Sequence, residues 1–359
     1  MKYNGKDASL CEAGRSFLKL NDIHESAHTD RQIWFIHGCR PEFSDIILTT
    51  TLRGQKNEKT RKLNSGAKMG FLFALPAAIY MMVFIGYPMI QNLILSFKNV
   101  DVYSFAQPDN QVFVGLQNYI ELFTSGNSIL TKSIANTLIF TVGSIFFQFI
   151  IGFALALLFN KKFAGCSFFR GMTMISWLLP VTVAGLLFKF MFASSGGIIN
   201  QFLQSLHIID QPMEWLLHPK SAMVAIIVAN IWIGIPFNMM LLITGLTTIP
   251  AEVYESCSLD GANKIQTLVM VTIPMIKPAI MSVLTLGFVY TFKVFDLVWV
   301  MTKGGPINST ELVSTYAYRL SFEEFQFSKG AAAANILFLI LLVVGVFYIK
   351  LINEEEEIM

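Results

Sequence analysis

From residue 71 onward, long apolar runs alternate with short polar segments. Six of these runs approach the roughly 20 residues that a membrane-spanning helix needs. They lie at about 71–97, 134–158, 172–192, 221–246, 276–301 and 333–352. Because a helix satisfies its own backbone polar groups in lipid, the pattern predicts an all-α membrane protein with six transmembrane helices.

Four prolines fall inside these runs: Pro76 and Pro88 in the first, Pro180 in the third and Pro236 in the fourth. Proline removes a helical hydrogen bond and clashes with the preceding turn, so each predicts a kink or an interruption. Such breaks are tolerated in a membrane where protein or a cavity satisfies the freed carbonyls.

The polar segment at 250–274, between the fourth and fifth runs, predicts two short helices rather than an ordinary loop. Pro250 suits the first turn of a helix, and Gly261 can take the left-handed conformation that ends it. Less polar residues then recur at i, i+3, i+4 and i+7: Ile265, Leu268, Val269 and Thr272. Pro274 is expected to stop the second helix.

Such a helix pair is suited to docking in a groove on a partner protein. Its charged side chains Glu255 and Asp260 offer carboxylates to basic groups opposite. Its small residues allow close backbone approach: Ser256, Cys257, Gly261 and Ala262. The alternative is a helical hairpin that rests on the membrane surface.

The composition agrees with a membrane protein. Apolar residues make up 54% of the 359 residues and charged residues 14%, against roughly 25% charged in soluble domains. The mean hydropathy is +0.56. No basic patch with interleaved aromatic residues indicates nucleic-acid binding. No apolar core follows Met1, so we expect no signal peptide.

Residues 1–68 are polar, and we expect a poorly ordered cytoplasmic tail. They carry 12 of the 26 Lys and Arg residues, with a basic cluster from Arg53 to Lys68. The tail is either an extension with its own partner or sequence upstream of the true translation start. Its potential zinc ligands are too loosely spaced and too few to predict a metal site: His24, His28, His37 and Cys39. A second, acidic tail covers residues 354–359.

The basic residues also predict the orientation, because short cytoplasmic loops are enriched in Lys and Arg. Six lie just before the first run, between Arg53 and Lys68, and Lys161, Lys162 and Arg170 lie between the second and third. We therefore expect both termini and the 250–274 segment in the cytoplasm. All four cysteines then face a reducing compartment without disulfides: Cys11, Cys39, Cys166 and Cys257.

Absent motifs predict that a transporter of this kind uses an ion gradient, is a passive channel or depends on a motor in another protein, and the 250–274 segment favours the last. The sequence has no Gly-x-x-x-x-Gly-Lys-Ser/Thr loop for ATP and no hydrolase motif such as His-Glu-x-x-His or Gly-x-Ser-x-Gly. An ion-coupled transporter, which is the alternative, usually has internal repeats and several acids at mid-membrane. Asp296 stands nearly alone there, and no duplicated halves are visible.

The 250–274 segment also resembles a family signature. Glu255, Asp260, Gly261, Ala262 and Pro274 match the loop of membrane subunits of binding-protein-dependent ABC importers, which forms the coupling helices that sit on the ATPases. The chain departs from that signature at three positions, which stay small or apolar: Ser256, Cys257 and Leu268.

Further matching stretches run through most of residues 71–350: Pro88 before Ser96-Phe97, Val114–Tyr119, Asn136-Thr137, Phe168–Arg170, Gly197–Asn200, Trp232–Phe237 and Gly304–Pro306. Together they resemble the sugar-permease branch, the maltose- and multiple-sugar-type first membrane subunit. The resemblance implies a bacterial-type inner-membrane protein with two ATP-binding subunits, a second and homologous permease, an extracytoplasmic solute-binding protein and a sugar substrate. It implies no catalytic residue and no cofactor in this chain.

Sugar sites pair hydrogen-bonding groups with aromatic platforms, so polar and aromatic residues within the spans are candidates for the substrate path. The candidates are Asn230, Trp232, Asn238, Tyr290, Lys293 and Asp296. Lys293 and Asp296, three residues apart in the fifth run, are expected to share a helical face where they can pair. For each candidate, the alternative is a structural role that ties two spans together.

Overall fold

The computed structural model describes residues 69–105, 107, 111–124, 128–161 and 163–356. The tail of residues 1–68, with His24, His28, His37 and Cys39, lies outside the described residues, as do residues 357–359. The chain divides into two units, Met1–Val83 and Phe84–Met359. The cavity and the helix pair described below both belong to the second unit.

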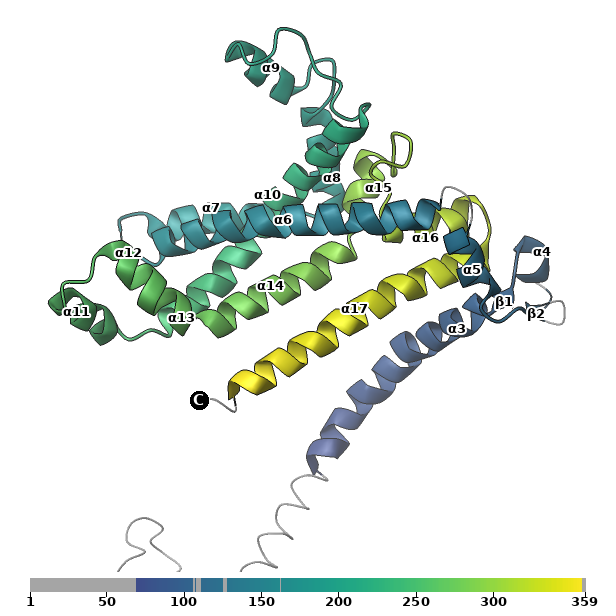
Figure 1. Cartoon of the computed structure of the whole chain (residues 1–359), viewed down its shortest axis with the longest axis horizontal. Helices are drawn as coiled ribbons and strands as arrows, with labels where there is room; N and C mark the ends of the chain where they lie inside the picture. Colours follow the sequence, from purple (N-terminus) through teal and green to yellow (C-terminus); the bar gives the residue numbers. More distant parts are fainter. Residues whose placement is uncertain (1–68, 106, 108–110, 125–127, 162, 357–359) are drawn as a thin grey trace, which may run out of the picture. The chain divides into compact units, whose positions relative to one another are not determined.

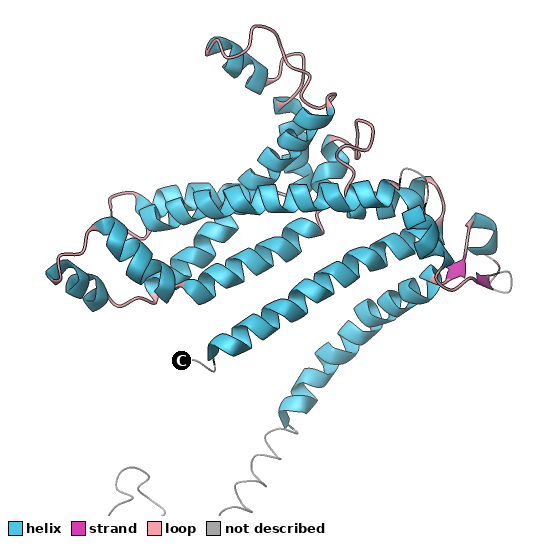
Figure 2. Cartoon of the chain, viewed as in Figure 1, coloured by secondary structure: helices cyan, strands magenta, loops and turns pink. Residues whose placement is uncertain are grey.

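Helices dominate the described chain (Figures 1 and 2). Residues 69–81 are helical and continue through the π-helical turn η3 (Met82–Gly86) into α3 (Tyr87–Ser96). The following elements are β1 (Lys98–Asn99), α4 (Val102–Phe105), β2 (Val112–Phe113), α5 (Gln117–Thr124), α6 (Ile129–Phe159), α7 (Cys166–Leu178), α8 (Val181–Met191), α9 (Ile198–Ser205) and α10 (Pro219–Thr247). Strands β1 and β2 pair antiparallel, with Lys98 opposite Phe113.

The second half of the chain is also helical. It contains α11 (Ala251–Leu259), α12 (Lys264–Thr267), η5 (Leu268–Thr272), α13 (Ile273–Met275), α14 (Lys277–Phe292), α15 (Asp296–Met301), α16 (Val313–Tyr318), η6 (Arg319–Glu323) and α17 (Phe327–Glu356). The second unit is built on α6 and α10, which pack along each other, while α14 packs against both. After α14, the short helix α15 packs on α8. The last helix, α17, packs against α3 and α16.

Candidate spans agree with the predicted fold class. Among the residues that the structure describes, four helices are long and apolar enough to cross a membrane: Met69–Ser96, Ile129–Phe159, Pro219–Thr247 and Phe327–Lys350. The number rises to six if each of two bent pairs is one span: Cys166–Leu178 with Val181–Met191, and Lys264–Met275 with Lys277–Phe292. The predicted all-α membrane fold class is therefore confirmed.

The breaks lie only partly where the prolines predicted them. The third span bends by 95° between α7 and α8, where Pro180 is the residue before α8. In contrast, α10 runs without interruption through Pro236, so the predicted interruption of the fourth span is wrong. Pro236 is buried in the helix packing. Loss of a single backbone hydrogen bond does not end a helix of 29 residues that is held on its neighbours.

Candidate functional site

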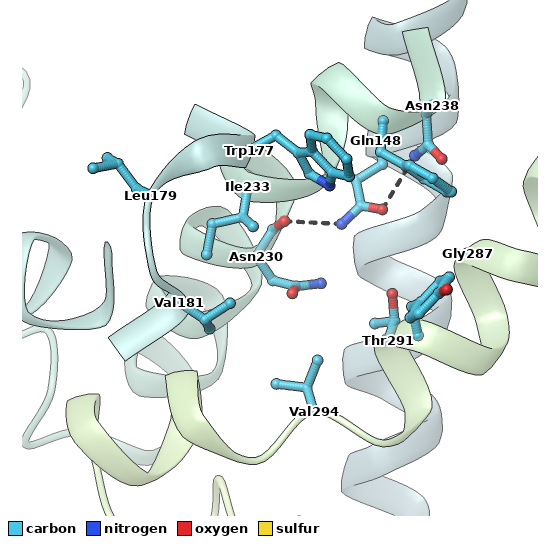
Figure 3. A pocket seen from close by; sticks show the side chains of 13 residues that line it. Gln148, Trp177, Leu179, Val181, Asn230, Ile233, Asn238, Gly287, Thr291 and Val294 are labelled. Atoms are coloured by element: carbon cyan, nitrogen blue, oxygen red, sulfur yellow. Dashed lines mark hydrogen bonds between the residues drawn. The ribbon is translucent and has the colours of Figure 1, made fainter. Parts of the chain in front are cut away.

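A cavity of about 350 Å³ lies where α6, α10 and α14 meet, beside the bend between α7 and α8. Its lining mixes amides, aromatic rings and aliphatic side chains: Gln148, Trp177, Leu179, Val181, Asn230, Ile233, Gly234, Phe237, Asn238, Gly287, Tyr290, Thr291 and Val294 (Figure 3). We call it the polar cavity. No Asp, Glu, Lys, Arg or His lines it, so its polar lining is uncharged.

Three buried amides form the polar wall of this cavity. Gln148 of α6 donates a hydrogen bond from Nε2 to the Asn230 carbonyl at 2.9 Å. Its Oε1 accepts one from Asn238 Nδ2 at 3.2 Å. Asn230 and Asn238 lie two helical turns apart on α10 and therefore face the same side. The Gln148 side chain thus bridges the two turns.

Gly234, midway between the two asparagines, makes room for this bridge. A Cβ at that position would lie 2.4 Å from Gln148 Cδ. On α6, Gly152 allows similarly close approach, because a Cβ there would lie 3.1 Å from Asn238 Cβ. Small residues at these points bring two helix backbones together, as is common where helices pack in membranes.

One hydrogen-bond donor in this polar wall has no acceptor among the described residues. Asn230 Nδ2 is buried and has no hydrogen-bond partner in the described part of the chain. The side chain points into the space between Val181 and Thr291 (Figure 3). A buried donor without a partner is unfavourable by about 1–3 kcal/mol. A ligand hydroxyl in the cavity would satisfy it.

Aromatic rings form another part of the lining. Trp177 and Phe237 stack with centroids 6.1 Å apart, and Phe237 meets Tyr290 edge-on at 5.9 Å. Lys293 Nζ lies 5.0 Å from the centroid of the Tyr290 ring. Trp177 and Tyr290 remain about half exposed, at 49% and 55%. Flat apolar faces are therefore available beside the amides.

The structure brings together three of the six predicted path residues. Asn230, Asn238 and Tyr290 line the polar cavity. Trp232 points elsewhere on α10, where it packs edge-on against Phe188 with centroids 5.5 Å apart. A position two residues from Asn230 on a helix faces a different side, which explains the difference.

Lys293 and Asp296 do not pair as expected. Both are exposed, and no ion pair joins them within the part of the chain that the structure describes. The i, i+3 geometry needs a continuous helix. Here α14 ends at Phe292 and α15 begins at Asp296, so the two side chains lie on either side of a break.

Sequence reasoning missed the four other polar or aromatic lining residues: Gln148, Trp177, Phe237 and Thr291. A signal existed for Gln148, since it is an amide inside an apolar run, where unpaired polar groups are costly. The aromatic residues gave no such signal, because rings are common on lipid-facing surfaces.

The helix pair of residues 250–274 has well-defined ends. The backbone N–H groups of Ala262 and Gly261 donate to the carbonyls of Cys257 and Ser258 at 3.0 and 3.2 Å, and Gly261 has φ +77°. This is the Schellman arrangement, which confirms the predicted role of Gly261. Asn263 then caps α12 by accepting from the N–H of Gln266, whose side chain accepts from the Asn263 N–H.

The second helix departs from the prediction in its interior. It passes from α12 through the π-helical η5 into α13, with Pro274 inside α13 and the end at Met275. Val253 and Tyr254 attach the pair to the core of α6 and α10. Large apolar side chains are nevertheless exposed, among them Leu259 at 87%, Ile265 at 73% and Met270 at 73%.

The predicted coupling residues are accessible. Glu255, Ser256, Asp260, Gly261 and Pro274 are exposed, while Cys257 and Ala262 are partly buried. Neither α11 nor α12 contains a buried residue. Their exposed surface combines apolar side chains with carboxylates, which suits contact with a protein partner better than contact with solvent.

Comparisons with known proteins agree with this architecture. Residues 148–354 match the family model described as "Binding-protein-dependent transport system inner membrane component". The trehalose/maltose transport system permease protein MalF of Thermococcus litoralis is 30% identical over 295 residues, covering 82% of this chain and 97% of the relative. The sulfoquinovosyl glycerol transport system permease protein SmoG of Agrobacterium fabrum is 30% identical, covering 83% and 94%.

The fold also resembles a solved structure. A chain of a bacterial ABC transporter involved in the import of the acidic polysaccharide alginate has a TM-score of 0.68 and 22% identity, covering 82% of this chain and 99% of its own. At this identity the likeness concerns the fold. The residues matched by the family model, 148–354, run from within α6 into α17 and include both the polar cavity and the helix pair.

Proposed function

The chain belongs to the family of binding-protein-dependent transport system inner membrane components, and from this premise we propose that it is a permease subunit of an ATP-driven carbohydrate importer. The observation that carries the proposal is the polar cavity. Its volume of about 350 Å³ falls within the roughly 300–1,000 Å³ of small-molecule sites. It joins uncharged amides to aromatic faces within a membrane-spanning fold.

This lining suits a sugar. Sugar hydroxyls can accept from Asn230 Nδ2 and exchange hydrogen bonds with the Gln148 and Asn238 amides. The apolar face of a pyranose ring can rest on Tyr290 or Trp177. Relatives named for trehalose/maltose and for sulfoquinovosyl glycerol support the same substrate class. We assign Gln148, Asn230 and Asn238 as hydrogen-bonding residues and Tyr290 and Trp177 as platforms.

The helix pair supplies the connection to a motor. In the proposed complex, two ATP-binding subunits contact the 250–274 segments of this chain and of a second, homologous permease. Glu255 and Asp260 offer carboxylates to basic groups, and Leu259 and Ile265 offer apolar contacts. ATP hydrolysis takes place in the separate subunits. Both termini of this chain and the helix pair lie on the cytoplasmic side of the inner membrane.

An uptake assay tests the proposal. The complex is purified from its native membrane through a tag on this chain, its co-purifying chains are identified, and it is reconstituted in vesicles with its solute-binding protein. We expect uptake of a radiolabelled oligosaccharide that requires ATP and persists when ionophores collapse all ion gradients. Uptake that continues without ATP and stops with the gradient would establish an ion-coupled transporter instead.

A further inference from the structure

One face of α6 carries a row of hydroxyl side chains that continues from the polar cavity toward the start of the helix. It begins one turn before Gln148, which belongs to the cavity wall. We call it the hydroxyl row, and its members are Ser144, Thr141, Thr137 and Ser133. Steps of three and four residues keep all of them on the same face of the helix as Gln148. All four are fully buried, with 0% of each residue exposed.

Three hydroxyls of this row have no hydrogen-bond partner in the described part of the chain: Ser133, Thr141 and Ser144. In contrast, Thr137 Oγ1 donates to the Ser133 carbonyl at 2.6 Å and accepts from the Val313 N–H at 3.0 Å. A buried hydroxyl in a helix can also bond to a carbonyl one turn back, as Ser176 does to Thr173 at 3.0 Å. The three open hydroxyls use neither kind of partner.

Close packing of helices does not by itself require hydroxyls at these positions. Where α6 needs a small residue against α10 it uses glycine, as at Gly143, where a Cβ would lie 3.3 Å from Ile227 Cδ1. A buried polar atom without a partner is unfavourable, so an apolar row would be more stable in this conformation. Asn230 Nδ2, at the cavity end of the row, is open in the same way. Open hydrogen-bonding groups thus extend from the cavity along α6.

An apolar cluster borders the row and belongs partly to α15. Phe140, the residue before Thr141, is buried in this cluster together with three residues of α15: Leu297, Val298 and Met301. Helix α15 has only six residues, and residues 293–295 separate it from α14. Within this break, Val294 lines the polar cavity. The apolar cover beside the row is therefore a short separate helix rather than part of a continuous span.

We propose that the hydroxyl row is the next hydrogen-bonding section of the sugar path, between the polar cavity and the outer face. Thr141 and Ser144 bond the hydroxyls of the sugar, or the water that accompanies it, in a conformation in which α15 has moved away from α6. In the described conformation the cluster of α15 and Phe140 closes this section, and its hydroxyls are left without partners. The inference rests on the proposed function, which supplies the sugar and places the start of α6 on the outer side.

Two valine substitutions separate a path hydroxyl from a structural one. Thr141→Val removes an open hydroxyl, so the melting temperature of the purified complex should stay the same or rise. Uptake of the radiolabelled oligosaccharide that the wild-type complex takes up should fall about two- to tenfold, because a sugar hydroxyl loses its partner. Thr137→Val is the matched control from the same row. It leaves the Val313 N–H without its acceptor and should lower the melting temperature.

A thiol probe tests whether the row opens to the outer side. Ser144→Cys is compared with Ile139→Cys, which lies on the opposite face of α6 and is 56% exposed. A membrane-impermeant methanethiosulfonate reagent is added on the outer side of reconstituted vesicles, with the wild-type chain as the background. Ser144→Cys should react at least about tenfold faster in the ATP-bound or vanadate-trapped complex than in the nucleotide-free complex. Ile139→Cys should show no such difference.

The outcomes distinguish this inference from the proposed function. Wild-type uptake by both Thr141→Val and Ser144→Ala would overturn the inference, as would equal reactivity of Ser144→Cys in all three states. A melting temperature of Thr141→Val as low as that of Thr137→Val would assign the open hydroxyls a structural role and overturn it as well. A wild-type complex that takes up no oligosaccharide would instead contradict the proposed function, and the inference with it.

Discussion

We call the packed contact between α6 and α10 the seam. The seam and the helix pair at 250–274 differ in how their polar groups are hydrogen-bonded and in how far their apolar surfaces are covered. In the seam, Gln148 bonds both Asn230 and Asn238, and one amide group, Asn230 Nδ2, is left open toward the cavity. In the helix pair, the caps at Gly261 and Asn263 are complete, yet Leu259 and Ile265 face outward. The seam is packed within this chain and leaves one amide donor facing the cavity, while the helix pair has a fully capped backbone and an apolar surface that the described part of this chain leaves uncovered.

The glycines of the two regions show the same difference. Gly234 and Gly152 have ordinary helical backbones and are needed for space, because a neighbouring helix occupies the position of a side chain. Gly261 has open space around it and is needed for its φ of +77°. A substitution in the seam should therefore act through packing, and one in the helix pair through backbone conformation and what docks on it.

The largest effect is expected at Gly261. Gly261→Val places a β-branched residue in the left-handed region, which raises the free energy of that backbone conformation by about 1–2 kcal/mol or more. The substitution therefore disrupts the end of α11. We expect the chain to remain in the membrane while co-purified ATPase falls about tenfold or more, with transport falling in parallel. Gly261→Asn tolerates the same backbone and serves as the control. If Gly261→Val retains its ATPase and normal uptake, the role assigned to the helix pair is wrong.

The next effect is expected in the seam. Gly234→Ala forces the Gln148 amide to move, since the new Cβ would lie 2.4 Å from Gln148 Cδ. Overpacking of this kind is unfavourable by about 1–3 kcal/mol. We expect a lower melting temperature of the purified complex and reduced uptake. Gly345→Ala in α17 is the control, because no atom lies within 4 Å of its new Cβ. Equal behaviour of the two variants would contradict the close packing of the seam.

Two aromatic substitutions separate a cavity residue from a packing residue. Tyr290→Ala should lower sugar uptake about two- to tenfold, from the loss of about 0.5–1.5 kcal/mol of ring contact, while the complex assembles normally. Trp232→Ala removes the contact with Phe188 and should lower the amount of assembled complex without altering which sugars compete. The reverse pattern would place the substrate path on the Trp232 side of α10.

The smallest effect is expected from the N-terminal tail, which belongs to neither region. Deletion of residues 1 to about 50 keeps the basic cluster from Arg53 to Lys68, which directs orientation. We expect membrane insertion and uptake to remain within about twofold of wild type, because the tail lacks the apolar periodicity of a packed domain. A truncated chain that inserts but does not transport would show that the tail has a function.

Features that depend on neighbouring residues in the sequence, such as apolar runs and helix ends, were predicted from the sequence. The apolar runs gave the spans, and Gly261 and Pro180 marked a helix end and a bend that the structure contains. Pro236 did not interrupt its helix, and the fifth run broke at Lys293 without any Gly or Pro. Both outcomes depend on packing against neighbouring helices, which one sequence does not display.

The sequence predicted that polar and aromatic residues within the spans line a cavity, but it identified only some of the lining residues. Asn230 and Asn238 were recognised as costly polar groups in a span, and the same argument applies to Gln148. Their convergence depends on Gly234 and on the register of α6 against α10. Trp177 lines the cavity because α7 packs on α10, where its ring stacks on Phe237. Long-range geometry of this kind follows from tertiary contacts rather than from periodicity.

The central claim is that the seam between α6 and α10 is packed within this chain, while the exposed surface of the helix pair is covered by the ATPase subunits. Hydrogen exchange tests this claim most directly. Amide exchange is compared between this chain in the purified complex and the same complex stripped of its ATPase subunits. We predict that amides of α11 and α12 exchange at least about tenfold more slowly when the ATPases are bound, with little change around Gln148 and Asn238. Equal exchange of α11 and α12 in both samples would contradict the account.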